Sequence, residues 1–184
     1  PDGADGGRGI EHLTKRIWRL AKNAEPESDR KTLFLDLGPV KPHERGFMSM
    51  TPHPNFRENR KYYLFDRGVE GVKDNVQILE RESAPDCRRD SGRASRVILN
   101  VPQVTSGHFG GWLEFGPDGF LYVSLGDSGP QEDPNGNSQN RGLLLGKMLR
   151  IDVDHREDGK AYAVPADNPF LGQAGMPPEI WAIG

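Results

Sequence analysis

Short runs of apolar residues, separated by polar turns that contain Gly and Pro, make up most of this chain. At residues 16–20 and 74–82, apolar and polar residues alternate, and this period of two predicts half-buried β-strands. The Gly- and Asp-rich start, residues 1–14, predicts irregular structure, and residues 143–147 suit a short helical turn. Further strands are expected at residues 32–37, 46–51, 61–66, 95–101, 112–115, 120–125, 147–154 and 179–183. The pattern therefore predicts an all-β protein of about ten short strands.

The clearest single element is a hairpin at residues 107–127, which read GHFGGWLEFGPDGFLYVSLGD. Its two apolar runs flank Gly116-Pro117-Asp118-Gly119, where Pro fixes one backbone angle and Gly accepts a positive φ, as a turn requires. Antiparallel pairing brings the open ends of a hairpin together. We therefore expect His108 and Asp127 to lie side by side, and a His beside a carboxylate is the minimal general-base pair.

A weak internal repeat indicates how the strands are arranged. Residues 47–66 and 112–127 share an apolar strand, a Pro-containing turn, an aromatic strand and a closing Asp. Repeated strand units favour propeller blades of about four strands each, so ten strands make roughly two and a half blades. Such an open ring would leave strand edges unpaired. We therefore expect residues 1–184 to be part of a propeller domain whose larger remainder follows residue 184.

Composition excludes several classes of protein. The 184 residues carry a net charge of −3 with a pI of about 6.0, and no basic patch indicates nucleic-acid binding. No apolar run approaches the length of about 18 residues that a membrane span needs. The single cysteine, Cys87, excludes an intramolecular disulfide and a zinc site built from cysteines. The start at Pro1 instead of Met agrees with an excised piece, so the lack of a targeting segment is uninformative.

Several blocks accompany the hairpin in a fixed order: RGFMSMTPHPNFRENRKYYLF (45–65), DPNGNSQN (133–140), LLGKMLRIDVD (144–154), YAVPADNPF (162–170) and PEIWAIG (178–184). Together they resemble the soluble glucose/sorbosone dehydrogenase family, six-bladed propellers that use pyrroloquinoline quinone (PQQ). The resemblance covers about residues 15–184. It implies an oxidoreductase that oxidises the C1 hydroxyl of an aldose or a related sugar, outside the cytoplasm, in the periplasm or after secretion. A cytochrome or a quinone would then accept the electrons.

The resemblance also implies roles for individual residues. His108 stands at the catalytic base, which takes the proton of the C1 hydroxyl as hydride passes to PQQ, and Asp127 stands at the carboxylate that orients it. Either Gln131 or Glu132 fills the place of a Gln that contacts the cofactor pocket. A Ca²⁺ ion polarises the quinone in this family. Its ligands and the arginines that clamp PQQ are expected after residue 184, so no metal ligand is assigned in this chain.

One departure from the family concerns the loop after the hairpin. The family often has Gly-Asp-Gly-Gly where this chain has Gly126-Asp127-Ser128-Gly129. The difference affects the expected shape of the loop but not the assignment of His108 as the base. A second resemblance bears on whether the chain has dehydrogenase activity. Propellers like that of the Hedgehog-interacting protein carry a comparable hairpin block, and they bind a protein ligand instead of oxidising a sugar. The alternative function is therefore a non-catalytic binding propeller, and a third is a family member that has lost PQQ binding.

Other polar and aromatic residues receive structural interpretations. Lys147 and Arg150 alternate with apolar residues and predict a solvated strand face. Trp112 and Trp181 are expected in the blade core and not as a platform for sugar. His53 is expected in a turn, as are His12, His43 and His155.

Two acidic stretches are also given structural interpretations. The run Asp133-Pro-Asn-Gly-Asn137 lacks the spaced carboxylates of a calcium loop and predicts a polar loop. Asp152 and Asp154 are expected to form a turn. Cys87 lies in a charged loop with no His near it in sequence, so it is no candidate nucleophile.

Overall fold

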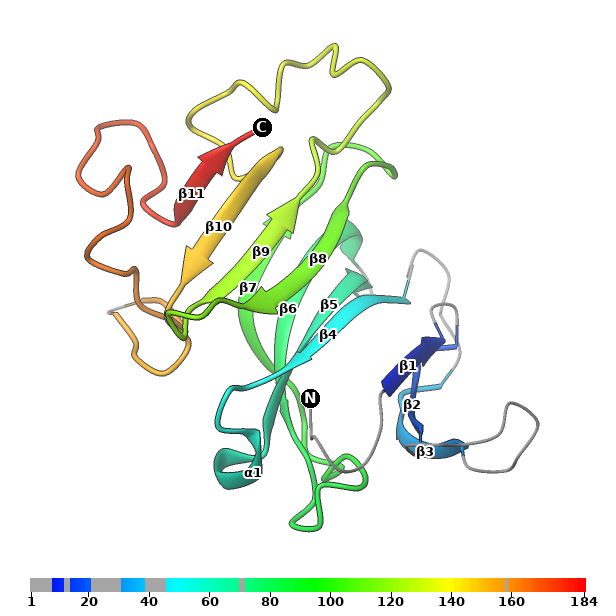
Figure 1. Ribbon diagram of the computed structural model, residues 1–184. Coiled ribbons are helices and arrows are strands. Elements are labelled where there is room, and N and C mark those ends of the chain that lie inside the picture. The colour runs from blue at the N-terminus through cyan, green and yellow to red at the C-terminus, as the bar shows by residue number, and fades with distance from the viewer. Residues whose placement is uncertain (1–7, 12–13, 21–30, 39–45, 70–71, 158) are drawn as a thin grey trace.

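A computed structural model describes residues 8–11, 14–20, 31–38, 46–69, 72–157 and 159–184. These residues form three antiparallel sheets with one single-turn helix, so the all-β prediction is confirmed (Figure 1). The elements are β1 (Arg8–Glu11), β2 (Arg16–Leu20), β3 (Lys31–Asp36), β4 (Gly46–Pro52), α1 (Phe56–Asn59), β5 (Lys61–Val69), β6 (Val72–Glu82), β7 (Arg96–Pro102), β8 (Gly110–Phe115), β9 (Leu121–Leu125), β10 (Lys147–Ile151) and β11 (Ile180–Ile183).

Each sheet is a meander in which strands that follow one another in sequence are also neighbours in space. The first sheet has the order β1-β2-β3, the second β4-β5-β6-β7 and the third β8-β9-β10-β11. Two sheets of four strands and one of three match the size of propeller blades. The structure thus has eleven strands in the described residues, close to the number expected from the sequence.

The predicted hairpin of β8 and β9 is confirmed. Glu114 pairs with Tyr122, and Phe115 pairs with Leu121. The turn between them closes through a hydrogen bond from the Gly116 amide to the Phe120 carbonyl, at 3.0 Å. Within the turn, a carboxylate oxygen of Asp118 accepts the Phe120 amide at 3.2 Å. The Pro-Asp-Gly sequence therefore forms the turn with the polar contacts that such residues provide.

Two apolar clusters hold the three sheets together. The larger lies between the second and third sheets, and alternation along β9 supplies it with Leu121, Val123 and Leu125. A smaller cluster lies between the first and second sheets. Its members are Ile17, Phe34, Leu35, Phe47, Phe56, Tyr62, Leu64 and Leu79.

Some expectations differ from the structure because local sequence was a poor guide to pairing. Within the predicted irregular start, residues 8–11 form β1, which pairs with β2 in full register. The predicted turn after β4 contains the single-turn helix α1. Residues 143–146 form turns and bends but no helix. His12 and His43 lie outside the described residues.

The predicted solvated face of β10 is wrong. Lys147 is 2% and Arg150 is 3% exposed, because loops fold over the sheet at both positions. Arg150 binds carboxylates at 2.9 Å on Asp118 and 2.7 Å on Asp167. Its guanidinium also stacks on two rings, those of Phe120 and Trp181.

The predicted core position of Trp112 is wrong as well, because its side chain is 45% exposed on the face of β8 that points away from the second sheet. Trp181 is partly buried and contacts the ring of Tyr122 edge-on.

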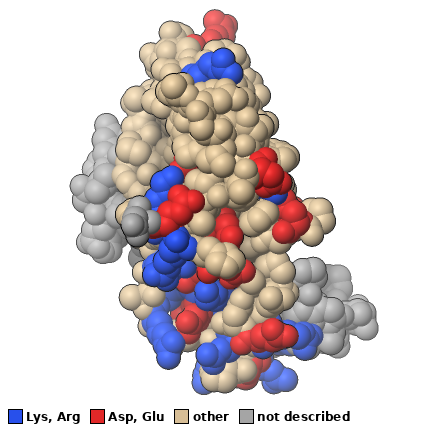
Figure 2. Space-filling view, turned by 90° about the vertical axis from the view of Figure 1, so that its left-hand side faces the viewer, with Lys and Arg blue, Asp and Glu red and all other residues tan. Residues whose placement is uncertain are grey.

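In Figure 2 the upper part of the visible face shows few charges, and lower down acidic and basic residues are mixed.

The second sheet contains a buried ion pair between Arg81 and Asp90. Arg81 donates to both carboxylate oxygens of Asp90, at 3.1 and 2.8 Å, and their side chains are only 5% and 7% exposed. The Tyr62 hydroxyl adds a bond of 2.6 Å to the same carboxylate. Burial alone would raise the pKa of Asp90, but the hydrogen bonds from Arg81 and Tyr62 outweigh burial and lower it. Asp90 is therefore an ionised group whose charge depends on Arg81.

Replacing Arg81 by Met should lower the free energy of unfolding by about 3–5 kcal/mol at pH 7, because Asp90 would remain buried without its partner. The Arg93→Met variant is the matched control: Arg93 binds Glu82 at the surface with a side chain that is 72% exposed, and its loss should cost under about 1 kcal/mol. Denaturant titration measures both values. Equal effects of the two substitutions would contradict the prediction.

The same pair predicts a pH dependence. The folded-state pKa of Asp90 lies below that of the unfolded chain, so the pair stabilises the protein above about pH 4, and this contribution is lost as pH falls through the folded-state pKa. The difference in unfolding free energy between the Arg81→Met variant and the wild type should therefore shrink in acid. A difference that stays constant from pH 7 to pH 3 would contradict this assignment.

Candidate functional site

His108 and Asp127 meet at the open end of the β8–β9 hairpin, as the sequence predicts. The Nδ1 atom of His108 lies 2.9 Å from Oδ1 of Asp127. A carboxylate only accepts hydrogen bonds, so Nδ1 carries the proton and Nε2 of the neutral ring keeps a lone pair. In the described part of the chain, Nε2 has no hydrogen-bond partner. The His108 side chain is 47% exposed and that of Asp127 is 17% exposed, so the imidazole is accessible while the carboxylate is mostly covered.

The backbone around the pair is closely fitted. The carbonyl of His108 accepts the Ser128 amide at 3.1 Å, which joins the two strand ends beyond the last paired residues. A side chain at Gly126 is impossible, because a Cβ there would lie 1.8 Å from the same carbonyl oxygen. His108 itself has a φ of 49°, a left-handed conformation that is uncommon outside glycine. Such strain persists only where the surroundings impose it, as functional sites often do.

Ser128 explains how the loop tolerates its departure from the family pattern. Its φ of 67° is one that glycine adopts without cost. Its hydroxyl oxygen accepts the amides of Val104 at 2.8 Å and Thr105 at 3.1 Å, and the Thr105 hydroxyl donates back to the Ser128 carbonyl. The side chain is fully buried. The hydrogen bonds of Ser128 therefore compensate for its unfavourable backbone conformation and hold this residue in the left-handed region that glycine would adopt.

The pair borders an open depression of about 570 Å³. Its lining comes from the ends of β8, β9, β10 and β11 and from the long loop between β9 and β10. Lys147 is the one Lys or Arg among the described residues that line it. A small molecule entering this depression would therefore meet His108 and a largely uncharged wall.

Gln131 and Glu132 lie apart from this depression. Both are exposed on the loop between β9 and β10, and neither lines the depression beside His108. Glu132 adopts a positive φ of 70°. The structure brings together His108 and Asp127 but does not add these two residues, so their role in cofactor binding stays a prediction.

The stretch 133–137 forms a closed polar loop. The two carboxylate oxygens of Asp133 accept the amides of Asn137 and Ser138, each at 2.9 Å. The amide of Ser138 contributes most to lowering the pKa of Asp133. No group of three or more His, Cys, Asp and Glu side chains suited to a metal ion occurs in the described ranges. The Asp133 carboxylate therefore accepts hydrogen bonds from backbone amides of its own loop.

Lys147 and Asn137 are the residues near the site that sequence reasoning missed. The Lys147 ammonium donates to the carbonyls of Asn137 at 3.2 Å, Ser138 at 2.5 Å and Leu145 at 2.8 Å. Burial lowers the pKa of Lys147, against the attraction of Asp133. The Asn137 amide in turn donates to the backbone carbonyl of Asp127 at 2.8 Å. Since all the acceptors are backbone atoms, no residue pattern in the sequence could reveal this contact.

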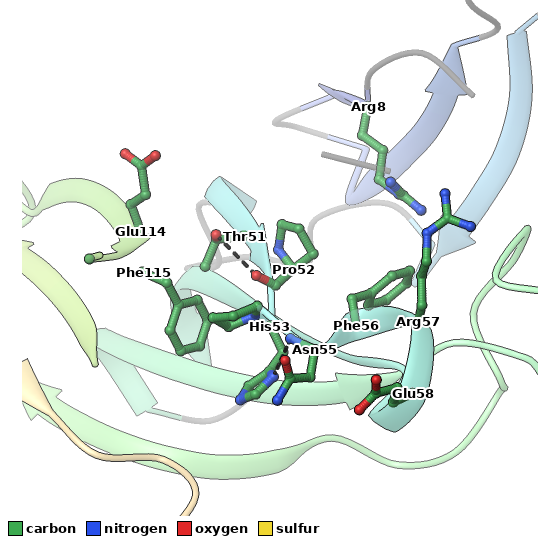
Figure 3. A pocket seen from close by; sticks show the side chains of 12 residues that line it. Arg8, Thr51, Pro52, His53, Asn55, Phe56, Arg57, Glu58, Glu114 and Phe115 are labelled. Carbon is green, nitrogen blue, oxygen red and sulfur yellow. Dashed lines mark hydrogen bonds between the residues drawn. The ribbon is translucent and has the colours of Figure 1, made fainter. Parts of the chain in front are cut away.

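A second depression, of about 480 Å³, lies where β4 and β8 end, next to α1 (Figure 3). His108 is not among the residues that line it. His53 lines it and is only 4% exposed. Its Nδ1 accepts the Asn55 amide at 3.0 Å and the Asn59 side-chain amide at 2.7 Å, while Nε2 lies 3.2 Å from Asp154. Both ring nitrogens are used, so His53 has no free lone pair for catalysis. The Phe56 amide donates to the His53 carbonyl at 2.9 Å, so His53 lies in a turn, as predicted.

A third His–Asp pair lies on the surface. Nδ1 of His155 lies 2.7 Å from Asp152 and its side chain is 78% exposed, outside both depressions. Asp152 also accepts the amides of Asp154 and His155, which confirms the predicted turn. Hydrogen bonding to Asp152 raises the pKa of His155. A His–Asp contact therefore occurs three times in the described residues, and His108 differs from the other two because it borders a depression and has an unpartnered ring nitrogen.

Comparison with known sequences identifies relatives. Residues 33–184 match the family model for glucose/sorbosone dehydrogenases. The chain is 34% identical over 148 residues to the Hedgehog-interacting protein of Homo sapiens, an alignment that covers 77% of the chain and 21% of that protein. It is also 34% identical over 142 residues to the aldose sugar dehydrogenase YliI of Escherichia coli, covering 76% of the chain and 35% of the enzyme. The chain thus spans a minor part of these relatives' length.

Solved structures with the same fold cover nearly the whole chain. A crystal structure of glucose dehydrogenase aligns with a TM-score of 0.75 and 26% identity over 100% of the chain and 49% of that protein. The PQQ-bound aldose sugar dehydrogenase of Streptomyces coelicolor aligns with a TM-score of 0.62 and 23% identity, over 90% of the chain and 44% of that protein. The predicted fold, part of a six-bladed propeller, is confirmed.

No helix in the described residues is long and apolar enough to cross a membrane. Because the family model matches most of the chain, and solved dehydrogenases share its arrangement of sheets, the chain belongs to the glucose/sorbosone dehydrogenase family.

Proposed function

We propose that this chain carries the general base of a PQQ-dependent sugar dehydrogenase that oxidises the C1 hydroxyl of an aldose or a related sugar. The observation that supports this most directly is the state of His108. One ring nitrogen is fixed by Asp127, and the other is unpartnered among the described residues and borders an open depression. Because the chain belongs to the glucose/sorbosone dehydrogenase family, the reaction that this base would assist is the oxidation of a sugar.

The His–Asp geometry suits removal of a hydroxyl proton. Nε2 of His108 accepts the proton of the C1 hydroxyl, and the C1–O bond becomes a carbonyl as the C1 hydrogen departs with its electron pair. The imidazolium that forms is stabilised by Asp127, whose Oδ1 also accepts the Gly129 amide at 2.8 Å. That second hydrogen bond keeps the carboxylate in place when the ring becomes charged.

PQQ, when bound, would supply the acceptor for the hydride, and Ca²⁺ would polarise its carbonyl groups. The described residues fit the reacting side of this chemistry, with an accessible base in an open depression. PQQ also carries carboxylates that need cations, and Lys147 is already fully used by three carbonyls. The cations and the calcium ligands are therefore expected from other residues of the protein. Gln131 or Glu132 would contact the cofactor only if their exposed loop closes over it.

The second candidate is a binding propeller without catalytic activity. The 34% identity to the Hedgehog-interacting protein over 77% of the chain favours it, because that relative is named for an interaction with a protein. In that case the His–Asp pair would serve only to close the hairpin. The enzyme would release its electrons to a cytochrome or a quinone, outside the cytoplasm, whereas the binding propeller needs neither PQQ nor an electron acceptor.

Replacing His108 by Asn should lower the rate of sugar oxidation by about 10²- to 10⁴-fold, because the amide cannot take up the proton. Dye reduction by the protein reconstituted with PQQ and Ca²⁺ measures this against a panel of aldoses. The control is His155→Asn, which removes a histidine from a similar pair at the surface and should leave the rate unchanged. Full activity of the His108→Asn variant would exclude His108 as the base.

Removal of the cofactor separates the two candidate functions. Chelation of Ca²⁺ should abolish dye reduction, and added Ca²⁺ should restore it, since the cation polarises the quinone. The His108→Asn variant should still show the spectral change of PQQ on binding, because its defect is in proton transfer. A wild-type protein with neither a PQQ-dependent spectral change nor activity would favour the binding propeller.

A further inference from the structure

Beside the candidate base lies a closed site for a cation, formed by backbone carbonyl oxygens and occupied by the end of Lys147. The three N–H bonds of the ammonium match three acceptors, the carbonyls of Asn137, Ser138 and Leu145. The side chain is 2% exposed. An unpaired ammonium at such a position would be very costly, so the three bonds are a condition of its burial.

The peptide units at Asn137 and Ser138 are held from two sides. Their carbonyls accept from Lys147, and their amides donate to the carboxylate of Asp133. A positive and a negative group thus fix the orientation of the same two residues. Hydrogen bonds to charged groups are roughly twice as strong as those between neutral groups, so this part of the loop is firmly anchored.

The anchored segment reaches the base through one side chain. Asn137 is 6% exposed, and its amide donates to the backbone carbonyl of Asp127 at 2.8 Å. One residue before Lys147, the Gly146 amide donates to the Gly126 carbonyl at 2.8 Å. The first contact ends on Asp127, which carries the carboxylate of the pair, and the second ends on Gly126, the residue before it. The path from the ammonium to His108 therefore runs through Asn137 and Asp127.

We propose that Lys147 is a positioning residue for the base: its ammonium acts as a tethered cation that holds Asn137 against Asp127 and so fixes the orientation of His108. The carbonyl site should then accept a free primary ammonium ion once the lysine side chain is removed. The effect on catalysis rests on the proposed function. The effect on the geometry of His108 does not.

The test is the Lys147→Ala variant with and without propylammonium, which restores the ammonium and the three methylene carbons that the substitution removes. Lys147 lines the depression, so truncating it to Ala opens the site toward the depression, from which the amine can enter. NMR signals of the His108 imidazole report the Asp127 contact without PQQ or sugar. We expect these signals to shift in Lys147→Ala and to return toward the wild-type positions with propylammonium, but not with propanol or sodium chloride.

In the reconstituted enzyme the same variant should lose about 10- to 100-fold in kcat with a smaller change in KM, because the base is displaced while the binding surface remains. Propylammonium should restore part of kcat. The matched control is Lys160→Ala, which removes a partly exposed lysine that binds Glu179 at 2.7 Å. It should show neither the loss nor the rescue.

A second variant tests the path and covers the case in which Lys147→Ala does not fold without the amine. Asn137→Ala removes the contact to Asp127 but leaves the three backbone carbonyls and Lys147 in place. It should shift the His108 signals as Lys147→Ala does, and propylammonium should not correct the shift. Unchanged His108 signals in Asn137→Ala, or in a folded Lys147→Ala, would overturn the proposal. Wild-type protein without dehydrogenase activity would refute the proposed function and leave the NMR test intact.

Discussion

The site depends on the antiparallel pairing of β8 and β9, because this pairing brings the chain segments that carry His108 and Asp127 together. The pairing continues beyond the last ladder residues through the bond between Ser128 and the His108 carbonyl. That continuation leaves no room for a side chain at Gly126. A tight closure of the strand ends thus attaches the His108 ring to the rigid part of a sheet, which is how precise sites are usually built.

Charged groups buried under loops complement the apolar clusters. Apolar residues are only 34% of the chain, and long connections must be fixed by other means. Lys147 fastens the connection between β9 and β10, Arg150 fastens the one between β10 and β11, and Arg81 joins β6 to the loop at Asp90. In each case a cation meets the acceptors that a loop leaves unpaired, so burial and hydrogen bonding are satisfied together.

The parts of the structure that local rules determine could be predicted from the sequence. The β8–β9 hairpin followed from two short apolar runs around the Pro-Asp-Gly turn, and the His–Asp contact followed from the hairpin. The burial of Lys147 and Arg150 could not be predicted, because it depends on how the loops before and after β10 fold over the strand. Trp112 was misjudged for the opposite reason, since an apolar side chain in a strand does not reveal whether another layer covers it. β1 was missed because its partner strand, not its own sequence, makes it extended.

The cage around Lys147 has a consequence for how this loop can diverge among relatives. All three acceptors belong to the main chain, so the hydrogen bonds of the anchor do not depend on which side chains stand at residues 137, 138 and 145. Exposed residues of the same loop, such as Gln131 and Glu132, lie outside the anchor altogether. Substitutions can therefore accumulate in the exposed part of this loop, while the contacts that anchor its other part to Lys147 remain unchanged.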